Sequence, residues 1–341
     1  MSESAVREDW NGTGVAIGDV LDRLAAQRRP AEGAPAVGLT GVLNLLAYAP
    51  GPADLEMMSS TIERLADRQP SRAVLLTEAP GGDGIDATVS TSCRLASDRS
   101  GVALETIVLT LHGEAIEGAA SAAVPLLRPD LPTVLWWPGP PSAGADGPLE
   151  RLAGIADRVV TEAGRAPGDT GLRALARWVP GAAPAVTDLA WAHITSWRQL
   201  IVQMIDEAAL ESLRGGPSTA TLTHAAAEPD AGTLLLAGWL REVVGETLAI
   251  DLRPGEGDAP WGPVSIGLVG ALSGRHMEIE RVPGRQAAAV CVTEADGTTR
   301  RRVLPLPDAD RARLLAGELE LQRRDRAFER ALARAAALET A

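Results

Sequence analysis

Between residues 37 and 179, short apolar runs alternate with amphipathic segments, and this alternation constrains the fold more than any other feature. Val37–Ala49, Ala73–Thr77 and Pro132–Trp137 are typical of buried strands. Ala53–Arg68 carries its apolar residues at intervals of three and four, which predicts an amphipathic helix. Strands that alternate with helices predict a layered α/β domain whose sheet is mainly parallel.

The same patterns extend the predicted domain toward residue 213. Further strands are expected at Ile85–Leu95, Glu105–Leu111 and Asp157–Thr161, and helices at Glu114–Leu127, Leu149–Ile155, Gly171–Val179 and Ser196–Leu213. Trp191 and Trp197 are six residues apart and would not share a face of one continuous helix. We therefore expect a break at Thr195, with Thr195 as the N-cap of the helix that follows.

Gly215–Ser218 (GGPS) is the clearest domain boundary in the chain. Beyond it we expect a helix at Thr233–Val244 and strands at Leu248–Leu252, Val264–Val269, Met277–Arg281, Ala288–Thr293 and Thr298–Leu304. The turn Ala295-Asp296-Gly297 predicts a hairpin. Three parts result: an N-terminal arm and linker (1–36), an α/β domain (37–215), and a smaller α+β domain (218–341). The last part has a more antiparallel sheet and ends in one long helix, Pro307–Leu338.

The chain has no lysine, because all 32 residues counted as Lys or Arg are arginine. This excludes enzymes that use a Schiff-base lysine, a P-loop lysine or the lysine of a protein kinase strand. The net charge is −13, which opposes binding to nucleic acid and to anionic membranes. We therefore expect neither as a partner.

Cysteine usage and hydropathy favour a cytoplasmic protein. The two cysteines, Cys93 and Cys291, form no CxxC motif. The start of the sequence is acidic and lacks the apolar core of a signal peptide. The longest apolar stretch, Val37–Ala49, is too short to span a bilayer.

No catalytic motif stands out in the sequence. GxGxxG, GxSxG, HExxH and P-loop patterns are all absent. A hydrolase that uses Cys93 or His112 in catalysis is an alternative function that we keep open. His276, Glu278 and Glu280 would share one face of a strand, but without a second cluster of ligands we predict no metal site.

The eight tryptophans are the most informative residues, and four of them lie in two short segments. Trp136 and Trp137 lie near the end of the segment PLLRPDLPTVLWWPG (125–139), whereas Trp191 and Trp197 lie in TDLAWAHITSWRQL (187–200). Neighbouring residues of a strand face opposite sides, so one of Trp136 and Trp137 fills a core. The four indoles are either core anchors or part of a groove or protein interface.

These two segments, with the strand ADRVV (156–160) between them, resemble the OpcA family of glucose-6-phosphate dehydrogenase assembly proteins in order and spacing. The likeness runs from about Val37 to Leu213. The sequence departs from the family at Val186, where Asp is common, and at Ser196, where Pro is common. Proline suits the first position of a helix, and serine at position 196 still allows a helix to begin there.

The resemblance implies a non-catalytic protein without a cofactor that binds glucose-6-phosphate dehydrogenase and promotes its assembly or allosteric activation. The partner-binding residues that we would test are Trp136, Trp137, Asp188, Trp191, Trp197 and Arg198. In some relatives the effect depends on thiol redox state, but here the two cysteines fall in different predicted domains.

The alternative function is a small-molecule sensor for sugar phosphates. Open α/β sheets bind ligands at the carboxyl ends of their strands. The loops Pro80–Gly84 and Pro138–Gly147 follow strands, and Arg128 or Arg151 would supply the cation for an anionic ligand.

Overall fold

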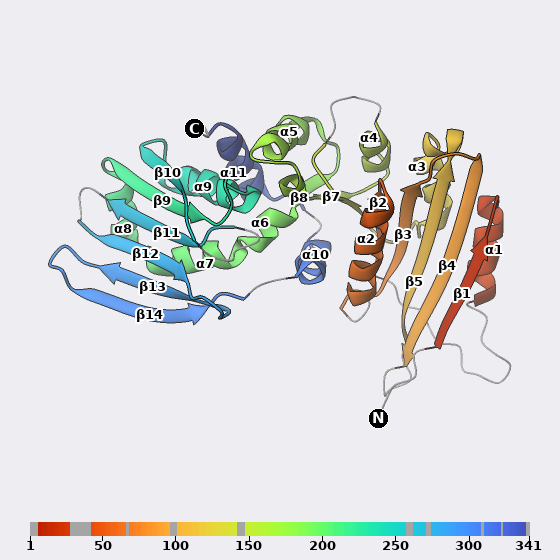
Figure 1. Ribbon diagram of the computed structural model, residues 1–341, viewed down its shortest axis with the longest axis horizontal. Coiled ribbons are helices and arrows are strands. Elements are labelled where there is room, and N and C mark those ends of the chain that lie inside the picture. Colours follow the sequence, from red (N-terminus) through yellow and green to blue (C-terminus); the bar gives the residue numbers. More distant parts are fainter. Residues whose placement is uncertain are drawn as a thin grey trace.

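The computed structural model of the protein describes residues 6–27, 42–65, 68–95, 101–141, 147–256, 262–270, 274–307, 310–321 and 323–338. Two β-sheets lie at opposite ends of the elongated molecule (Figure 1). The first sheet has eight strands and the second has six. The predicted layered α/β fold, followed by a more antiparallel α+β part, is confirmed.

The first sheet is mainly parallel, with the strand order β1-β4-β5-β3-β2-β6-β7-β8. Only β4 is antiparallel to its neighbours, β1 and β5. Strand β2 is buried along its whole length, as its continuous apolar run predicts. The strands are β1 (Val6–Gly12), β2 (Leu43–Ala49), β3 (Ser71–Glu78), β4 (Gly84–Leu95), β5 (Gly101–His112), β6 (Thr133–Trp137), β7 (Arg158–Thr161) and β8 (Ala185–Asp188).

Helices cover both faces of the first sheet. On one face, α1 (Ile17–Gln27), α3 (Ala119–Ala123) and α4 (Pro148–Ala153) share a core with the sheet. On the other face, α2 (Pro52–Leu65) packs beside α10 (Arg311–Leu319). Short 3₁₀ turns complete this part: η1 (Gly113–Ile116), η2 (Val124–Leu126), η3 (Ala163–Arg165) and η4 (Val179–Gly181).

The start of the chain is not an arm, and that expectation is wrong. Strand β1 pairs with β4, and Trp10 lies opposite Val89 in the ladder. Helix α1 buries Val20 and Leu24 against the same sheet. The amphipathic pattern of α1 therefore reflects packing onto the first domain. Residues 28–41, with the predicted linker and the start of the predicted strand Val37–Ala49, lie outside the described residues.

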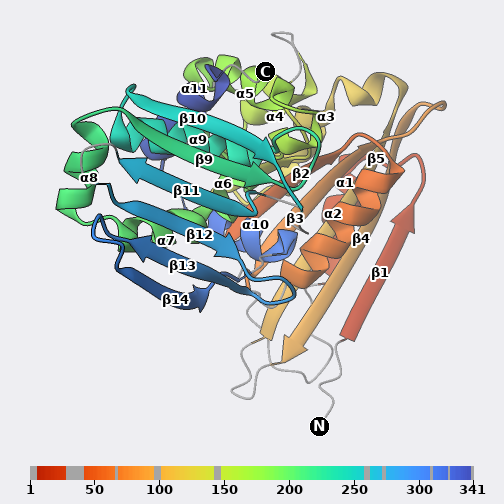
Figure 2. The ribbon, with the colours of Figure 1, turned by 60° about the vertical axis from the view of Figure 1, so that its left-hand side comes forward.

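The second sheet has the order β10-β9-β11-β12-β13-β14, and only β10 and β9 pair in parallel. Figure 2 shows its strands in front, with α9 (Ala231–Val244) behind them. The predicted hairpin joins β13 and β14, and Gly297 adopts the positive φ that its turn requires. The strands are β9 (Ser218–His224), β10 (Leu248–Pro254), β11 (Ser265–Gly270), β12 (His276–Arg281), β13 (Ala287–Thr293) and β14 (Thr299–Pro305).

Strand β9 was not expected from the sequence, although it lies between β10 and β11. Its residues STATLTH alternate between buried and half-buried positions. Of its four buried positions only Ala220 and Leu222 are apolar, because Ser218 and His224 occupy the other two, so the period of two that marks a strand is weak in the sequence.

The predicted helix Ser196–Leu213 is interrupted. The structure has α6 (Leu189–His193), α7 (Thr195–Met204) and α8 (Glu207–Arg214), preceded by α5 (Thr170–Trp178). The expected break before Trp197 is confirmed, but Thr195 is the first residue of α7 and not its cap. A second break follows Met204, where the Asp206 side chain accepts a hydrogen bond from the Ala209 backbone N–H and starts α8.

The expected long terminal helix is also divided. Helix α10 ends at Leu319, and α11 (Arg326–Ala336) begins after Asp325, whose carboxylate accepts hydrogen bonds from two backbone N–H groups. The two helices serve different parts of the molecule, because α10 packs against α2 and α6 whereas α11 packs against α9 and α5. Figure 1 shows α10 between the two sheets.

Candidate functional site

The structure places the six predicted partner-binding residues on two strands of the first sheet and on α6 and α7. They come from the carboxyl ends of two strands and from the two helices that follow: Trp136 and Trp137 end β6, Asp188 ends β8, Trp191 lies on α6, and Trp197 and Arg198 lie on α7.

Trp136 connects the first sheet to the C-terminal helix α10. Its indole is fully buried, and Nε1 donates to a carboxylate oxygen of Glu162 at 2.9 Å. The other oxygen of Glu162 pairs with Arg311 of α10 at 3.1 Å. A buried indole N–H needs an acceptor, and here the acceptor is itself neutralised by a cation.

Trp137 lies on the opposite face of β6, as the alternation of a strand requires. Its ring stacks on Tyr48 with centroids 4.8 Å apart and planes 9° from parallel. Nε1 donates to the Pro140 carbonyl at 3.3 Å. Trp137 is half-buried, so part of its ring remains exposed.

Asp188 is a fully buried carboxylate with three donors aimed at it. One oxygen accepts from the Ala190 backbone N–H at 2.8 Å, which caps α6. The other accepts from the Ala163 backbone N–H and from the Thr161 hydroxyl, both at 2.7 Å. The side chain thus joins the carboxyl ends of β7 and β8 to the start of α6.

Burial raises the pKa of Asp188 to about 6, against the lowering effect of these hydrogen bonds and with a small further rise from Glu162. The Thr161 hydroxyl also lies 3.0 Å from the Thr187 carbonyl, and one proton serves only one acceptor. When Asp188 is protonated it donates to Thr161, whose own proton then reaches Thr187. The neutral acid is therefore well accommodated.

Trp191 and Arg198 form a second cluster, with α11. The guanidinium of Arg198 lies 3.6 Å from the centroid of the Trp191 ring, in cation–π geometry. Trp191 Nε1 donates to Asp325 at 2.8 Å, and its ring packs beside Phe328. Burial lowers the pKa of Arg198 to about 10, and the negative charge of Asp325 partly opposes this. Arg198 also donates to Thr195.

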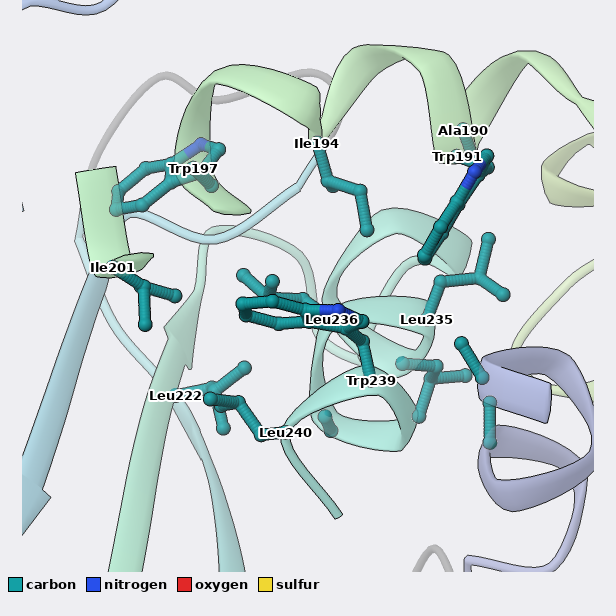
Figure 3. Packing of buried hydrophobic residues seen from close by; sticks show 14 of the residues in the cluster. Ala190, Trp191, Ile194, Trp197, Ile201, Leu222, Leu235, Leu236, Trp239 and Leu240 are labelled. Atoms are coloured by element: carbon teal, nitrogen blue, oxygen red, sulfur yellow. The ribbon is translucent and has the colours of Figure 1, made fainter. Parts of the chain in front are cut away.

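Trp197 lies in the core that joins α7 to the second domain. Figure 3 shows its indole in one cluster with Ile194, Ile201 and Trp239 of α9. It is fully buried. Because α6 and α7 are separate helices, Trp191 and Trp197 reach the same core despite their spacing of six residues.

The six residues thus form three groups and not one continuous surface. Trp136, Asp188, Trp191 and Trp197 are at most 1% exposed. Only Trp137 and Arg198 have area available to another molecule. The assignment of all six to partner binding stays a prediction, and the buried four can influence a partner only through the positions they hold.

Sequence reasoning missed the contacts that bind the C-terminal helices to the first domain. Arg158 of β7 pairs with Glu318 of α10 at 2.6 Å, and both side chains are buried. Arg324 donates to the Ala182 carbonyl, 142 residues earlier in the chain. The many arginines of residues 300–334 were the only sign of these contacts in the sequence. Composition does not reveal that some of these side chains, such as Arg311 and Arg324, contact the first domain.

A small cavity of about 150 Å³ lies at the carboxyl ends of β7 and β8. Its polar lining includes Glu162, Arg165 and Asp188 from the first domain and Asp230 from the start of α9. Arg165 is paired with Asp54 at 2.5 Å, and Asp230 accepts from the backbone N–H groups of the first turn of α9. The charged side chains that line the cavity are thus already paired with other groups of the protein.

The residues that a sugar-phosphate sensor would use lie at opposite edges of the first sheet. Asn44, at the start of β2, bonds the backbone of Arg128, which places Arg128 at the amino edge. The loop Pro80–Gly84 follows the carboxyl end of β3, so Arg128 does not serve it. Arg151 of α4 lies close enough to Tyr48 for its charge to act on the tyrosine pKa. Half of the loop Pro138–Gly147, residues 142–146, lies outside the described residues.

His112 stabilises the turn between β3 and β4 through both of its ring nitrogens. Its Nδ1 lies 2.8 Å from the Gly81 carbonyl and its Nε2 lies 3.1 Å from Asp86. The hydrogen bond to Gly81, followed by that to Asp86, raises the pKa of His112. The side chain of Cys93 lies outside the described part of the chain, so no pairing with His112 can be assigned.

Within the described ranges, no three His, Cys, Asp or Glu side chains gather into a group that could hold a metal ion. In the same residues, no helix is long and apolar enough to cross a membrane.

The fold and these contacts define a class: a two-sheet α/β protein whose tryptophans and C-terminal arginines join its two domains. Two family models match in sequence order. The glucose-6-phosphate dehydrogenase subunit N-terminal domain matches residues 62–177, and the corresponding C-terminal domain matches residues 184–332. The chain belongs to the OpcA family of glucose-6-phosphate dehydrogenase assembly proteins. This membership associates it with that enzyme.

A search of curated proteins finds no match. Among solved structures, KijD10, a 3-ketoreductase from Actinomadura kijaniata, aligns at 12% identity and a TM-score of 0.47, over 87% of this chain and 95% of its own. UDP-N-acetylglucosamine 3-dehydrogenase GnnA from Acidithiobacillus ferrooxidans aligns at 11% identity and 0.42, over 86% of this chain and 95% of its own. These values are too low to support any inference about activity.

Proposed function

We propose that this chain binds glucose-6-phosphate dehydrogenase without catalysing a reaction itself, and that it promotes assembly or allosteric activation of the enzyme. The observation that carries the proposal is the match of both family domains, in order, from residue 62 to residue 332. The arrangement of the predicted site supports it, because the described tryptophans and acids serve packing and hydrogen bonding.

The mechanism is differential binding. A protein that prefers the active form of an oligomeric enzyme shifts the population toward that form by the size of the preference. A tenfold preference corresponds to about 1.4 kcal/mol. Such a partner needs a rigid surface of fixed shape and no reactive group of its own.

The exposed parts of Trp137 and Arg198 are the predicted contacts. Tryptophan and arginine are enriched among residues that dominate binding energy at interfaces. The buried residues Trp136, Asp188 and Trp191 fix the ends of β6 and β8 and the start of α6, and so position these contacts. Arg198 is held over Trp191, which lowers the entropy that it loses on binding.

Substitution of Arg198 tests the contact. Arg198→Ala should weaken binding to the dehydrogenase at least tenfold in a titration, whereas Arg177→Ala should leave it unchanged. Arg177 is an exposed arginine on α5 and serves as the matched control. Thermal unfolding of both variants confirms that the fold is retained. Equal affinities for the two variants would remove Arg198 from the contact surface.

The sensor alternative predicts that a sugar phosphate stabilises the chain alone. Thermal unfolding with millimolar glucose 6-phosphate or 6-phosphogluconate should show no shift if the chain acts only through its partner. A dose-dependent rise of several degrees would favour the sensor.

A further inference from the structure

The parallel part of the first sheet has the strand order of folds that bind dinucleotides. In the order β5-β3-β2-β6-β7-β8, the six parallel strands are the third, second, first, fourth, fifth and sixth in the chain. Dinucleotides bind across the crevice where such an order reverses, which here lies between β2 and β6. The fold therefore implies a nicotinamide or flavin dinucleotide, and the residues present can be compared with that requirement.

The turn after β2 does not suit a pyrophosphate. Such sites use a GxGxxG turn whose backbone N–H groups approach the phosphates. Here the turn is Ala49-Pro50-Gly51-Pro52, and neither proline has an N–H to donate. Gly51 is not required by close packing, because a Cβ added to it would meet no atom within 4 Å.

The first turn of the next helix adds a negative charge. Asp54 lies in the first turn of α2, where a dinucleotide site would hold the pyrophosphate. Its carboxylate is paired with Arg165 of η3 at 2.5 Å. A bound pyrophosphate would approach this carboxylate, and the cation that could offset the repulsion is already engaged.

Side chains of the protein fill the crevice itself. Tyr48, near the end of β2, is 3% exposed and stacks on Trp137 at the end of β6. These two strands flank the point where the order reverses. The Tyr48 hydroxyl donates to Glu78, the last residue of β3. An acidic residue some way beyond the glycine turn holds the ribose hydroxyls in dinucleotide sites, and Glu78, which has the position for that role, already accepts from Tyr48.

We infer that the stack of Tyr48 on Trp137, the Tyr48–Glu78 hydrogen bond and the proline turn close the dinucleotide crevice, so that this chain binds no NAD(P) or flavin dinucleotide. The domain has the strand order of a cofactor-binding fold and uses the corresponding crevice for packing. Any nicotinamide dependence of a complex with a dehydrogenase then comes from the enzyme alone. This inference does not rest on the proposed function.

Titration calorimetry of the intact chain tests the inference with NAD⁺, NADH, NADP⁺ and NADPH, each to 1 mM. We expect no saturable heat and no shift in thermal unfolding, while a dehydrogenase of known affinity in the same buffer gives both. A flavin dinucleotide is tested in the same way. Saturable binding of any of these to the wild-type chain would overturn the inference.

The closure itself has an independent readout, because Tyr48 is the only tyrosine in the chain. Absorbance titration near 295 nm should show no tyrosinate until well above pH 10, because burial and then Glu78 raise the pKa of Tyr48. Tyr48→Phe removes the signal and should lower the unfolding temperature by a few degrees through the lost hydrogen bond. A tyrosine that titrates near pH 10 in the folded chain would show that the crevice is open.

Discussion

At the scale of single residues, the polar groups that matter most are buried, and Asp188 is the clearest case. Its carboxylate accepts from the Thr161 hydroxyl of β7, from the first residue of η3 and from the first turn of α6. Asparagine has one oxygen and one NH2 group, so the NH2 group would face the backbone N–H of either Ala163 or Ala190. We expect Asp188→Asn to lower the free energy of unfolding by about 1–3 kcal/mol, measured by urea denaturation at pH 7.

The same variant should change the pH dependence of stability. The folded pKa of Asp188, about 6, lies above the unfolded value of about 3.9. Protonation therefore favours the folded state, and this contribution is complete below pH 4 and is lost as pH rises through 6. It amounts to about 3 kcal/mol. The stability difference between wild type and Asp188→Asn should shrink from pH 4 to pH 7, and a constant difference would contradict the assigned pKa.

Trp191 offers a second test at this scale. Trp191→Phe keeps a ring beneath Arg198 but removes the N–H that donates to Asp325. We expect a loss of about 1.5–3 kcal/mol, typical of a hydrogen bond to a charged group. Trp178→Phe is the control, because no described contact uses its N–H. Equal losses in the two variants would mean that the bond to Asp325 contributes nothing.

Much of the residue-level pattern could be predicted from the sequence. The opposite facing of Trp136 and Trp137 follows from strand alternation, and the helix break before Trp197 follows from spacing. The hydrogen-bond partners of Trp136 and Trp191 could not be predicted, because Glu162 and Asp325 lie 26 and 134 residues away from them in the chain. Periodicity describes which side a residue faces and not which distant residue it meets.

At the scale of elements, α10 belongs by contact to the first domain although it follows the second sheet in sequence. Its buried leucines pack against α2 and the first sheet, and Glu318 reaches Arg158 of β7. The helix thus holds the C-terminal part of the chain against the first domain. Sequence reasoning missed this because an amphipathic pattern predicts a buried face without identifying the surface that covers it.

Substitutions in the Arg158–Glu318 pair test how α10 is held against the first domain. Removing one partner of a buried pair leaves an uncompensated charge, so Glu318→Leu alone should cost about 3–5 kcal/mol. The double variant Arg158→Met with Glu318→Leu should recover most of that loss. The exposed pair Arg64–Asp310 is the control and should contribute at most about 1 kcal/mol. A single variant as stable as the wild type would mean that α10 is not held by this pair.

Strands β1 and β9 show where sequence patterns fail at this scale. The alternation in β1 is polar on one face and rests on Trp10, and two of the four buried positions of β9 hold the polar residues Ser218 and His224. Both strands obtain their stability from ladders with distant partners, β4 and β10–β11. Tertiary pairing overrides weak local preference in such strands.

At the scale of the whole molecule, the two domains form one continuous framework. The core of the second sheet includes α5, α6, α7, α9 and α11, so helices from both halves of the chain pack together. A shared core of this kind suits the proposed role, because a preorganised surface loses little binding energy to ordering.

The central claim is that the chain binds glucose-6-phosphate dehydrogenase and favours its active form. The most direct test is the glucose 6-phosphate saturation curve of the purified enzyme, recorded with and without a stoichiometric amount of this chain. We predict a curve displaced to lower substrate concentration, with co-elution of the two proteins in size-exclusion chromatography. Superimposable curves from proteins that elute separately would contradict the account.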